Sequence, residues 1–266
     1  MKKLILLLVL ASLAGCAGLQ HQQTFQQSSP TKFPATTNVM VFEYRNVDIH
    51  NIYDLLFSDF LIIGKSGFTG SYEDPRASLE FAKSIGTDVF VTTSQFKGTR
   101  TSFVPMSTPT SDTSYISGYN GGTPFYGTTN SYGTTTTMIP VNYDRYEQNG
   151  LYLKNVNHVT PLWEKKASDY KETSSSPMAG IWYNENYDLK MYKSGVHMVA
   201  FFNSVPKGKE KGQLDDIKML FNPETGAGIY MMADRTPQPA QIRINKFGNL
   251  QVDIASQNET YSFARR

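Results

Sequence analysis

Residue types that could do chemistry are present in this chain, but their spacing does not assemble them into a recognised kind of site. The histidines lie far apart, and none stands at a metal-ligand spacing from another; they are His21, His50, His158 and His197. The chain has a single cysteine, so only carboxylates could assist them, and Asp215-Asp216 is an isolated pair. Structural zinc sites use four Cys or His ligands at short spacings. The sequence therefore predicts no metal site and no cofactor.

Hydrolytic chemistry has as little support. The chain has no Gly-x-Ser-x-Gly motif, which would place a nucleophilic serine in a tight turn. Gly64-Lys65-Ser66-Gly67 is similar to the end of a phosphate-binding loop, but Asp59 stands where that motif needs its first glycine. Glycoside hydrolysis needs two carboxylates facing one cleft, and no pair is marked as converging. The available carboxylates are Glu43, Asp88, Asp144 and Glu147. We therefore expect no enzyme, with a hydrolase as the less supported alternative.

The single cysteine, Cys16, ends a pattern at the start of the chain. Lys2-Lys3 is followed by an apolar run from Leu4 to Ala11 and then by small residues before Cys16. A basic start, a brief apolar core and small residues at the exit are typical of a secretory signal peptide. The run is too short to span a bilayer, since a helix needs about 20 apolar residues. Residues 1–15 are therefore expected to direct export and to be removed.

The exit of that segment, Leu13-Ala14-Gly15-Cys16, resembles the lipobox of bacterial lipoproteins. The resemblance implies that Cys16 receives a diacylglyceryl group and begins the mature chain. Several acyl chains hold a protein durably, because each buried methylene contributes about 0.8 kcal/mol. Ala17, in place of Asp, is similar to lipoproteins released to the outer membrane in enteric-type sorting. We expect a lipid-anchored envelope protein, at the outer membrane, whose first partner is the membrane itself.

The charge of the mature chain argues against a nucleic-acid partner. The sequence holds 25 basic and 23 acidic residues, and removal of Lys2 and Lys3 leaves the mature chain near neutral. Nucleic-acid binding needs clustered basic charge to neutralise phosphates. With 16 Tyr and 16 Phe, the chain can build a folded core.

Residue patterning divides the chain up to residue 178 into a tether, a domain and a linker. Residues 16–37 are rich in Gln, Ser, Thr and Pro, which predicts a lipidated flexible tether. Residues 38–168 alternate strand, helix, strand, helix and further strands, which indicates an α+β domain. Its helices begin after the capping residues Asp48 and Asp74. The expected strands are 39–44, 61–63, 88–92, 141–154 and 160–166, and residues 165–178 are expected to be a linker.

Residues 105–140 form a low-complexity insertion in that domain. Of its 36 residues, 30 are Ser, Thr, Gly, Tyr, Asn or Pro. A long loop without regular structure is usually functional or disordered, and spaced aromatic residues among small polar ones can make an adaptable binding surface. The alternative is a mobile polar insertion without a partner. The candidate partner-contact residues are Tyr115, Tyr119, Phe125, Tyr126 and Tyr132.

Residues 179–266 are expected to be all β. Apolar residues alternate with polar ones, and turn-forming residues separate the runs. Successive short antiparallel strands predict an up-and-down meander, closed into a small barrel or folded as a sandwich. The expected strands are 180–185, 188–193, 197–203, 214–221, 227–233, 240–245, 249–255 and 260–265.

Gly180-Ile181-Trp182 at the start of this region resembles the Gly-x-Trp motif of calycins, barrels that hold small ligands. The resemblance implies that Trp182 closes one barrel end, often against an arginine of the last strand, and Arg265 and Arg266 are available. The region is short for that family, which leaves little interior volume; alternatively, Trp182 fills a solid core. We expect a non-enzymatic binding or scaffold module that contacts an envelope protein or a surface partner. The alternatives are a carrier of a small apolar ligand and, with less support, an envelope hydrolase.

Overall fold

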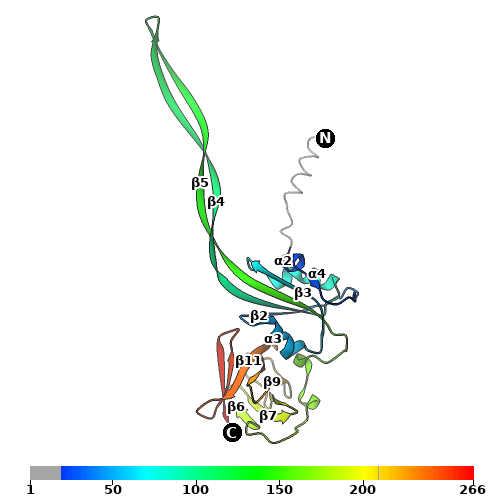
Figure 1. Ribbon diagram of the computed structural model, residues 1–266. Helices are drawn as coiled ribbons and strands as arrows, with labels where there is room; N and C mark the ends of the chain where they lie inside the picture. Colours follow the sequence, from blue (N-terminus) through cyan, green and yellow to red (C-terminus); the bar gives the residue numbers. More distant parts are fainter. Residues whose placement is uncertain (1–18, 209) are drawn as a thin grey trace. The chain divides into compact units, whose positions relative to one another are not determined.

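The computed structural model describes residues 19–208 and 210–266 and divides them into two units (Figure 1). One unit comprises the described residues up to Phe96 together with Tyr146–Arg266, and the other is Lys97–Arg145. Most described residues lie in strands, and the described helices include none that is long and apolar enough to cross a membrane.

An open sheet of five strands, in the order β1-β3-β5-β4-β2, forms one part of the larger unit. Strand β2 pairs with β4 in parallel, whereas β3 pairs with β1 and β5 in antiparallel fashion. Two of the three interior strands, β4 and β5, are also the longest. The strands are β1 (Gln26–Gln27), β2 (Met40–Arg45), β3 (Leu61–Gly70), β4 (Val89–Asn120) and β5 (Thr123–Lys154).

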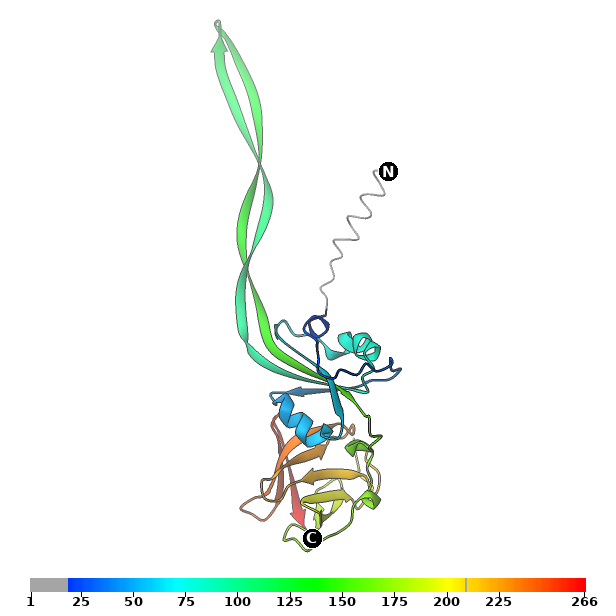
Figure 2. The ribbon, with the colours of Figure 1, turned by 45° about the vertical axis from the view of Figure 1, so that its right-hand side comes forward.

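Short helices cover this sheet (Figure 2). Asp48 accepts a hydrogen bond from the His50 backbone N–H, and Asp74 accepts one from the Arg76 N–H, so each carboxylate satisfies a backbone donor at a helix start. The helices are α2 (Gln20–Gln23), α3 (Ile49–Ile52) with its π-helical continuation η1 (Tyr53–Phe57), and the 3-10 turn η2 (Pro75–Ser78) leading into α4 (Leu79–Ser84).

Successive side chains of β4 point to opposite faces of the sheet and enter two different apolar cores. Val89 and Val91 belong to a core that also contains side chains of α3, η1 and the outside of the C-terminal barrel. Phe90, between them, belongs to a second core with Tyr152, against which Phe81 of α4 packs. This two-sided burial follows from the period of two along a strand.

Eight antiparallel strands form a closed barrel, as the sequence predicted for residues 179–266 (Figure 1). Each strand pairs with the next in chain order, and β13 pairs with β6. Closure leaves no unpaired edge, and a sandwich is excluded. The strands are β6 (Gly180–Tyr183), β7 (Asp188–Ser194), β8 (His197–Phe202), β9 (Ile217–Phe221), β10 (Ala227–Met231), β11 (Pro237–Ile244), β12 (Leu250–Ile254) and β13 (Glu259–Arg265).

The segment expected to be a flexible tether is largely folded onto the sheet. Helix α2 and strand β1 lie within it, and β1 pairs with β3. His21 is fully buried. The Phe25 ring lies 5.2 Å from the rings of both Phe81 and Tyr152, measured between centroids. These apolar contacts come from residues distant in sequence, which is why the local polar composition did not reveal them.

The expected linker also has structure. The predicted strand 160–166 is instead the 3-10 turn η3 (Leu162–Glu164), because burying the adjacent side chains of Leu162 and Trp163 in one core requires a helical turn. Within 165–178, η4 (Ala167–Asp169) is followed by Tyr170, which packs on Phe201 of the barrel. No unit boundary therefore falls between the sheet and the barrel, which share a core.

The burial of His21 predicts an acid-sensitive fold. Burial lowers the pKa of His21 from 6.5 to about 4, and Nδ1 lies 2.8 Å from Ser66 Oγ. The unfolded chain binds the proton first as pH falls from 6.5, so the free energy of unfolding should decline down to about pH 4, by roughly 3 kcal/mol. Chemical denaturation should be measured between pH 6.5 and 4 for the unsubstituted protein and for His21→Gln, which carries no titrating ring. The free energy of unfolding should fall by more in the unsubstituted protein than in the variant. Equal pH slopes in the two proteins would contradict the assignment.

Candidate functional site

Residues 97–145 form a two-stranded hairpin, and they include residues 105–140, where the sequence predicted a loop without regular structure. Strands β4 and β5 are joined by Gly121 and Gly122, whose φ angles are +57° and +87°. Positive φ at both central residues is characteristic of the type I′ turn that matches strand twist. Side-chain hydrogen bonds cross the arms at positions symmetric about this turn. They join Thr99 to Asp144, Thr101 to Asn142, Ser107 to Thr136 and Thr113 to Asn130.

Two contacts at the base of the hairpin indicate a bulge in β4. The rings of Phe96 and Tyr146 lie 5.6 Å apart, so these residues share a face of the sheet. The next contact joins Thr99 to Asp144, which leaves two residues of β4 opposite one residue of β5. Gly98 in this interval has a φ of +116°, which a residue with a Cβ rarely adopts. Because β4 has one extra residue here, the side chains of β4 that follow it point to the opposite face of the ribbon from the one that strict alternation would give. This residue lies where the two units of the chain meet in sequence.

Four of the predicted contact residues share one face of the hairpin. The cross-strand register places Tyr115, Tyr119, Tyr126 and Tyr132 on the same side, because side chains alternate along each strand. Their exposed fractions lie between 79% and 85%. We call these four residues the tyrosine face. Phe125 belongs to β5, but its side chain lies outside the part of the chain that the structure describes.

Prolines interrupt the outer edges of the hairpin. In a two-residue hairpin the positions flanking the turn are hydrogen-bonded to each other, and the bonding then alternates. All four prolines of the arms fall on the alternate, non-hydrogen-bonded positions, where the backbone nitrogen faces outward. Proline there removes a donor from the open edge without breaking the ladder between the arms. They are Pro105, Pro109, Pro124 and Pro140.

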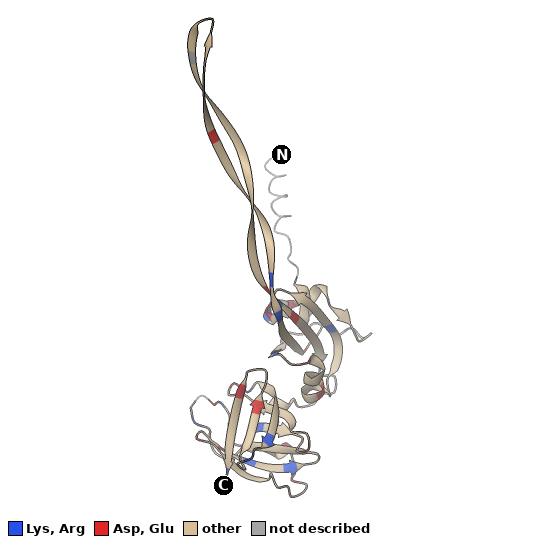
Figure 3. Ribbon diagram, turned by 60° about the vertical axis from the view of Figure 1, so that its left-hand side comes forward, with Lys and Arg blue, Asp and Glu red and all other residues tan. Residues whose placement is uncertain are grey.

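The hairpin carries few charges (Figure 3). Between Arg100 and Asp144, Asp112 is its one charged residue. Its exposed apolar side chains are therefore not shielded by lysine or glutamate, which commonly guard open strands. Those on the face opposite the tyrosines include Val104, Met106, Ile116, Ile139 and Val141. Exposed apolar and aromatic groups without charge favour contact with another surface.

Trp182, the remaining predicted contact residue, lies on the first barrel strand and is buried. Its Nε1 donates to the Met178 carbonyl oxygen at 2.9 Å, and the Arg265 guanidinium lies 5.7 Å from its ring centroid. Arg265 also donates to the carbonyl oxygens of Pro177 and Ala179 at 3.0 and 2.9 Å. Arg265, on the last strand, thus holds the segment that leads into the first strand, beside the pairing of β13 with β6.

A buried lysine that no sequence pattern marks lies in β9. Lys218 is 1% exposed, and its Nζ donates to Glu210 Oε2 at 2.9 Å and to the Met231 carbonyl oxygen at 2.5 Å. The ammonium lies 4.3 Å from the Tyr230 ring centroid and 5.4 Å from that of Tyr187. Burial lowers the pKa of Lys218 to about 8, although Glu210 opposes that shift. Glu210 and the Met231 carbonyl therefore pair the buried ammonium within the fold.

Apolar side chains from every barrel strand meet in one interior cluster. Trp182, Met219, Ile242 and Phe263 are among its members. Gly228 is held close to the Phe221 Cβ, since a Cβ on Gly228 would lie 2.2 Å from it. An eight-stranded barrel has an interior just wide enough for side chains or one small ligand, and here side chains occupy it.

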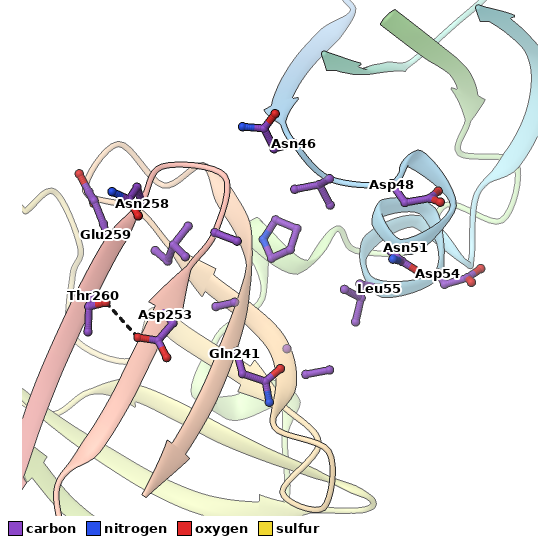
Figure 4. Close-up of a pocket in the computed structure, with 17 residues that line it drawn as sticks. Asn46, Asp48, Asn51, Asp54, Leu55, Gln241, Asp253, Asn258, Glu259 and Thr260 are labelled. Carbon is purple, nitrogen blue, oxygen red and sulfur yellow. Dashed lines mark hydrogen bonds between the residues drawn. The ribbon is translucent and has the colours of Figure 1, made fainter. Parts of the chain in front are cut away.

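A recess of about 790 Å³ lies where α3 and η1 approach barrel strands β10 to β12 (Figure 4). Leu55 contributes to its wall from the helix, and Gln241 and Asp253 contribute from the barrel. Asp253 is already paired, with Arg243 at 2.8 Å and Thr260 at 2.9 Å. The recess brings together amide and carboxylate groups, but its lining has no Ser or Cys nucleophile beside a histidine base.

Three of the carboxylates weighed for glycoside chemistry, Glu43, Asp88 and Asp144, have separate structural roles. Asp88 binds Lys154 at 2.7 Å and the Asn155 N–H at 3.0 Å, and Glu43 accepts from the Tyr72 hydroxyl at 2.7 Å. Asp144 serves the hairpin, as described above. Asp216, of the Asp215-Asp216 pair weighed for metal binding, is buried against Lys166 and Arg235. Across residues 19–208 and 210–266, no three His, Cys, Asp or Glu side chains are grouped to hold a metal ion.

Comparison with known proteins adds no relative: no family model, curated protein or solved structure matches the chain. Cys16 lies outside the described residues. Within the described residues, the exposed tyrosine face is the candidate binding site.

The position of Trp182 predicts a large loss of stability on truncation. Trp182→Ala should lower the free energy of unfolding by about 3–5 kcal/mol, because a large ring is removed from a filled core. The control is Tyr183→Ala: Tyr183 is 38% exposed and contacts Arg266 on the outside of the barrel. Denaturation followed by circular dichroism should show less than about 1 kcal/mol for this control. Similar losses in both variants would contradict a core role specific to Trp182.

Proposed function

We propose that this protein is a membrane-anchored envelope lipoprotein, lipidated at Cys16, that acts as a non-enzymatic binding or scaffold module. The hairpin is its binding element, and the tyrosine face recognises an envelope protein or a surface partner. The single observation that carries this proposal is the exposure of four tyrosines on one face of a nearly uncharged ribbon.

Tyrosine suits this role on physical grounds. It offers a large contact area with little conformational entropy to lose, and its hydroxyl can form a hydrogen bond at the rim of a contact. Isolated exposed tyrosines are common, but Tyr115, Tyr119, Tyr126 and Tyr132 lie on one face, within the half of the hairpin nearer its turn. The prolines along the open edges disfavour strand addition over the full length, so side-chain recognition is the favoured mode.

The filled barrel interior supports the scaffold over the alternative of an apolar-ligand carrier. A carrier needs interior space, whereas side chains of all eight strands meet inside this barrel. Trp182 then acts by joining the barrel core to Arg265. The partner of the hairpin is accordingly expected to be a macromolecular surface.

Site-specific photo-crosslinking in cells tests the role of the tyrosine face. A photoreactive phenylalanine analogue at Tyr119 should give a discrete crosslinked species, whereas the same analogue at Phe247, an exposed barrel residue, should not. Changing Tyr115, Tyr126 and Tyr132 to Thr should remove that species while leaving the melting temperature within about 2 °C, since exposed positions contribute little to stability. Threonine keeps the strand preference of the arms.

The matched control changes Ile116 and Ile139, on the opposite face, to Thr. The crosslink at Tyr119 should survive these changes. A crosslink that persists without the other tyrosines, or one that is equally strong from Phe247, would contradict recognition by the tyrosine face.

A further inference from the structure

Three aromatic rings form an exposed cluster at the end of the open sheet. Tyr146 lies 5.6 Å from both Tyr72 and Phe96, measured between ring centroids. Phe96 is 52% exposed and Tyr72 is 41% exposed. We call Tyr72, Phe96 and Tyr146 the aromatic patch. All three residues belong to the larger unit.

The aromatic patch lies on the same sheet face as the first described residues of the chain. Tyr146 pairs with Gly70, and a Cβ on Gly70 would lie 2.7 Å from Gln20 Oε1. Two residues along β5 from Tyr146, Gln148 accepts a hydrogen bond from the Glu73 N–H at 2.7 Å. The same glutamate accepts from the Gln20 N–H at 2.5 Å. Helix α2 is thus fixed beside the patch.

The length of chain before α2 limits the distance from the patch to a membrane anchor. Cys16 is four residues before Gln20. A chain spans at most about 3.6 Å per residue, so the two Cα atoms lie within roughly 14 Å of each other. This step rests on the proposed lipidation of Cys16. Because α2 is fixed to the sheet, the acyl chains would hold this part of the fold against the bilayer surface.

We propose that the aromatic patch rests in the headgroup region of the phospholipid bilayer that holds Cys16. Tyrosine and phenylalanine suit this region, where an apolar ring meets a hydrated surface. The Tyr72 hydroxyl donates to Glu43, whose carboxylate lies 3.9 Å from Arg45, so the polar rim of the patch is partly charge-balanced. The lipid and the patch together give the protein a fixed face toward the membrane.

Quenching of tryptophan fluorescence by brominated lipid tests whether the aromatic patch lies in the headgroup region. The full acylated protein is placed in phosphatidylethanolamine and phosphatidylglycerol vesicles that contain brominated lipid, which quenches tryptophan on contact. Phe96→Trp and Tyr72→Trp should be quenched at least twofold more than Phe247→Trp, the control on the barrel, which is 76% exposed. The buried Trp163 and Trp182 give a background that is measured in the unsubstituted protein and subtracted.

Mass spectrometry of the mature N-terminus and vesicle flotation separate the two possible failures. An acylated protein that floats with vesicles but shows equal quenching at positions 72, 96 and 247 contradicts the placement of the aromatic patch in the bilayer. The proposed lipid anchor is then unaffected. An unmodified Cys16 in a protein that does not float contradicts the lipid anchor, and with it the placement of the aromatic patch in the bilayer.

Discussion

The pairing of β4 with β5 is the interaction on which the rest of the structure depends. The first residues of β4 and the last residues of β5 are neighbours in the interior of the open sheet, where Phe90 stacks on Tyr152 with ring centroids 4.5 Å apart. The remaining residues of the two strands are the whole hairpin. The contacts of Phe96 and Thr99 indicate a bulge between these two residues, where the register changes. A shift by one residue would move every side chain of an arm to the other face. The tyrosine face therefore exists only because this register is kept.

The barrel and the hairpin differ in whether their edge strands are paired. The barrel closes on itself, and Arg265 and the β13–β6 pairing complete the ring. The hairpin cannot close, so both of its outer edges stay open over the length of its own unit. Outward-facing prolines break those edges at intervals, which limits pairing with other strands while the side-chain faces remain available. In the function proposed above, the barrel is the scaffold and the hairpin recognises the partner.

The sequence predicted the barrel strand by strand because its apolar residues alternate and meet in one local core. Ile242 and Val252, for example, are paired across β11 and β12 and both are buried. The hairpin was missed because Ser, Gly and Pro masked the strand preference of its Thr and Tyr residues, although Gly121-Gly122 marks a two-residue turn. The folded tether was missed because His21 and Phe25 are buried by residues far along the chain. Lys218 carried no local signal, since a lysine on a strand is ordinarily exposed.

Nuclear magnetic resonance across the hairpin tests the register most directly. Opposite residues at non-hydrogen-bonded positions bring their Hα protons close together, with Cα atoms about 4.5 Å apart. The register therefore predicts strong Hα–Hα contacts between Thr113 and Asn130 and between Thr101 and Asn142, together with strand-type chemical shifts along both arms. Random-coil shifts over residues 101–142, or Hα contacts displaced by one residue, would contradict the account, because the four tyrosines would no longer share a face.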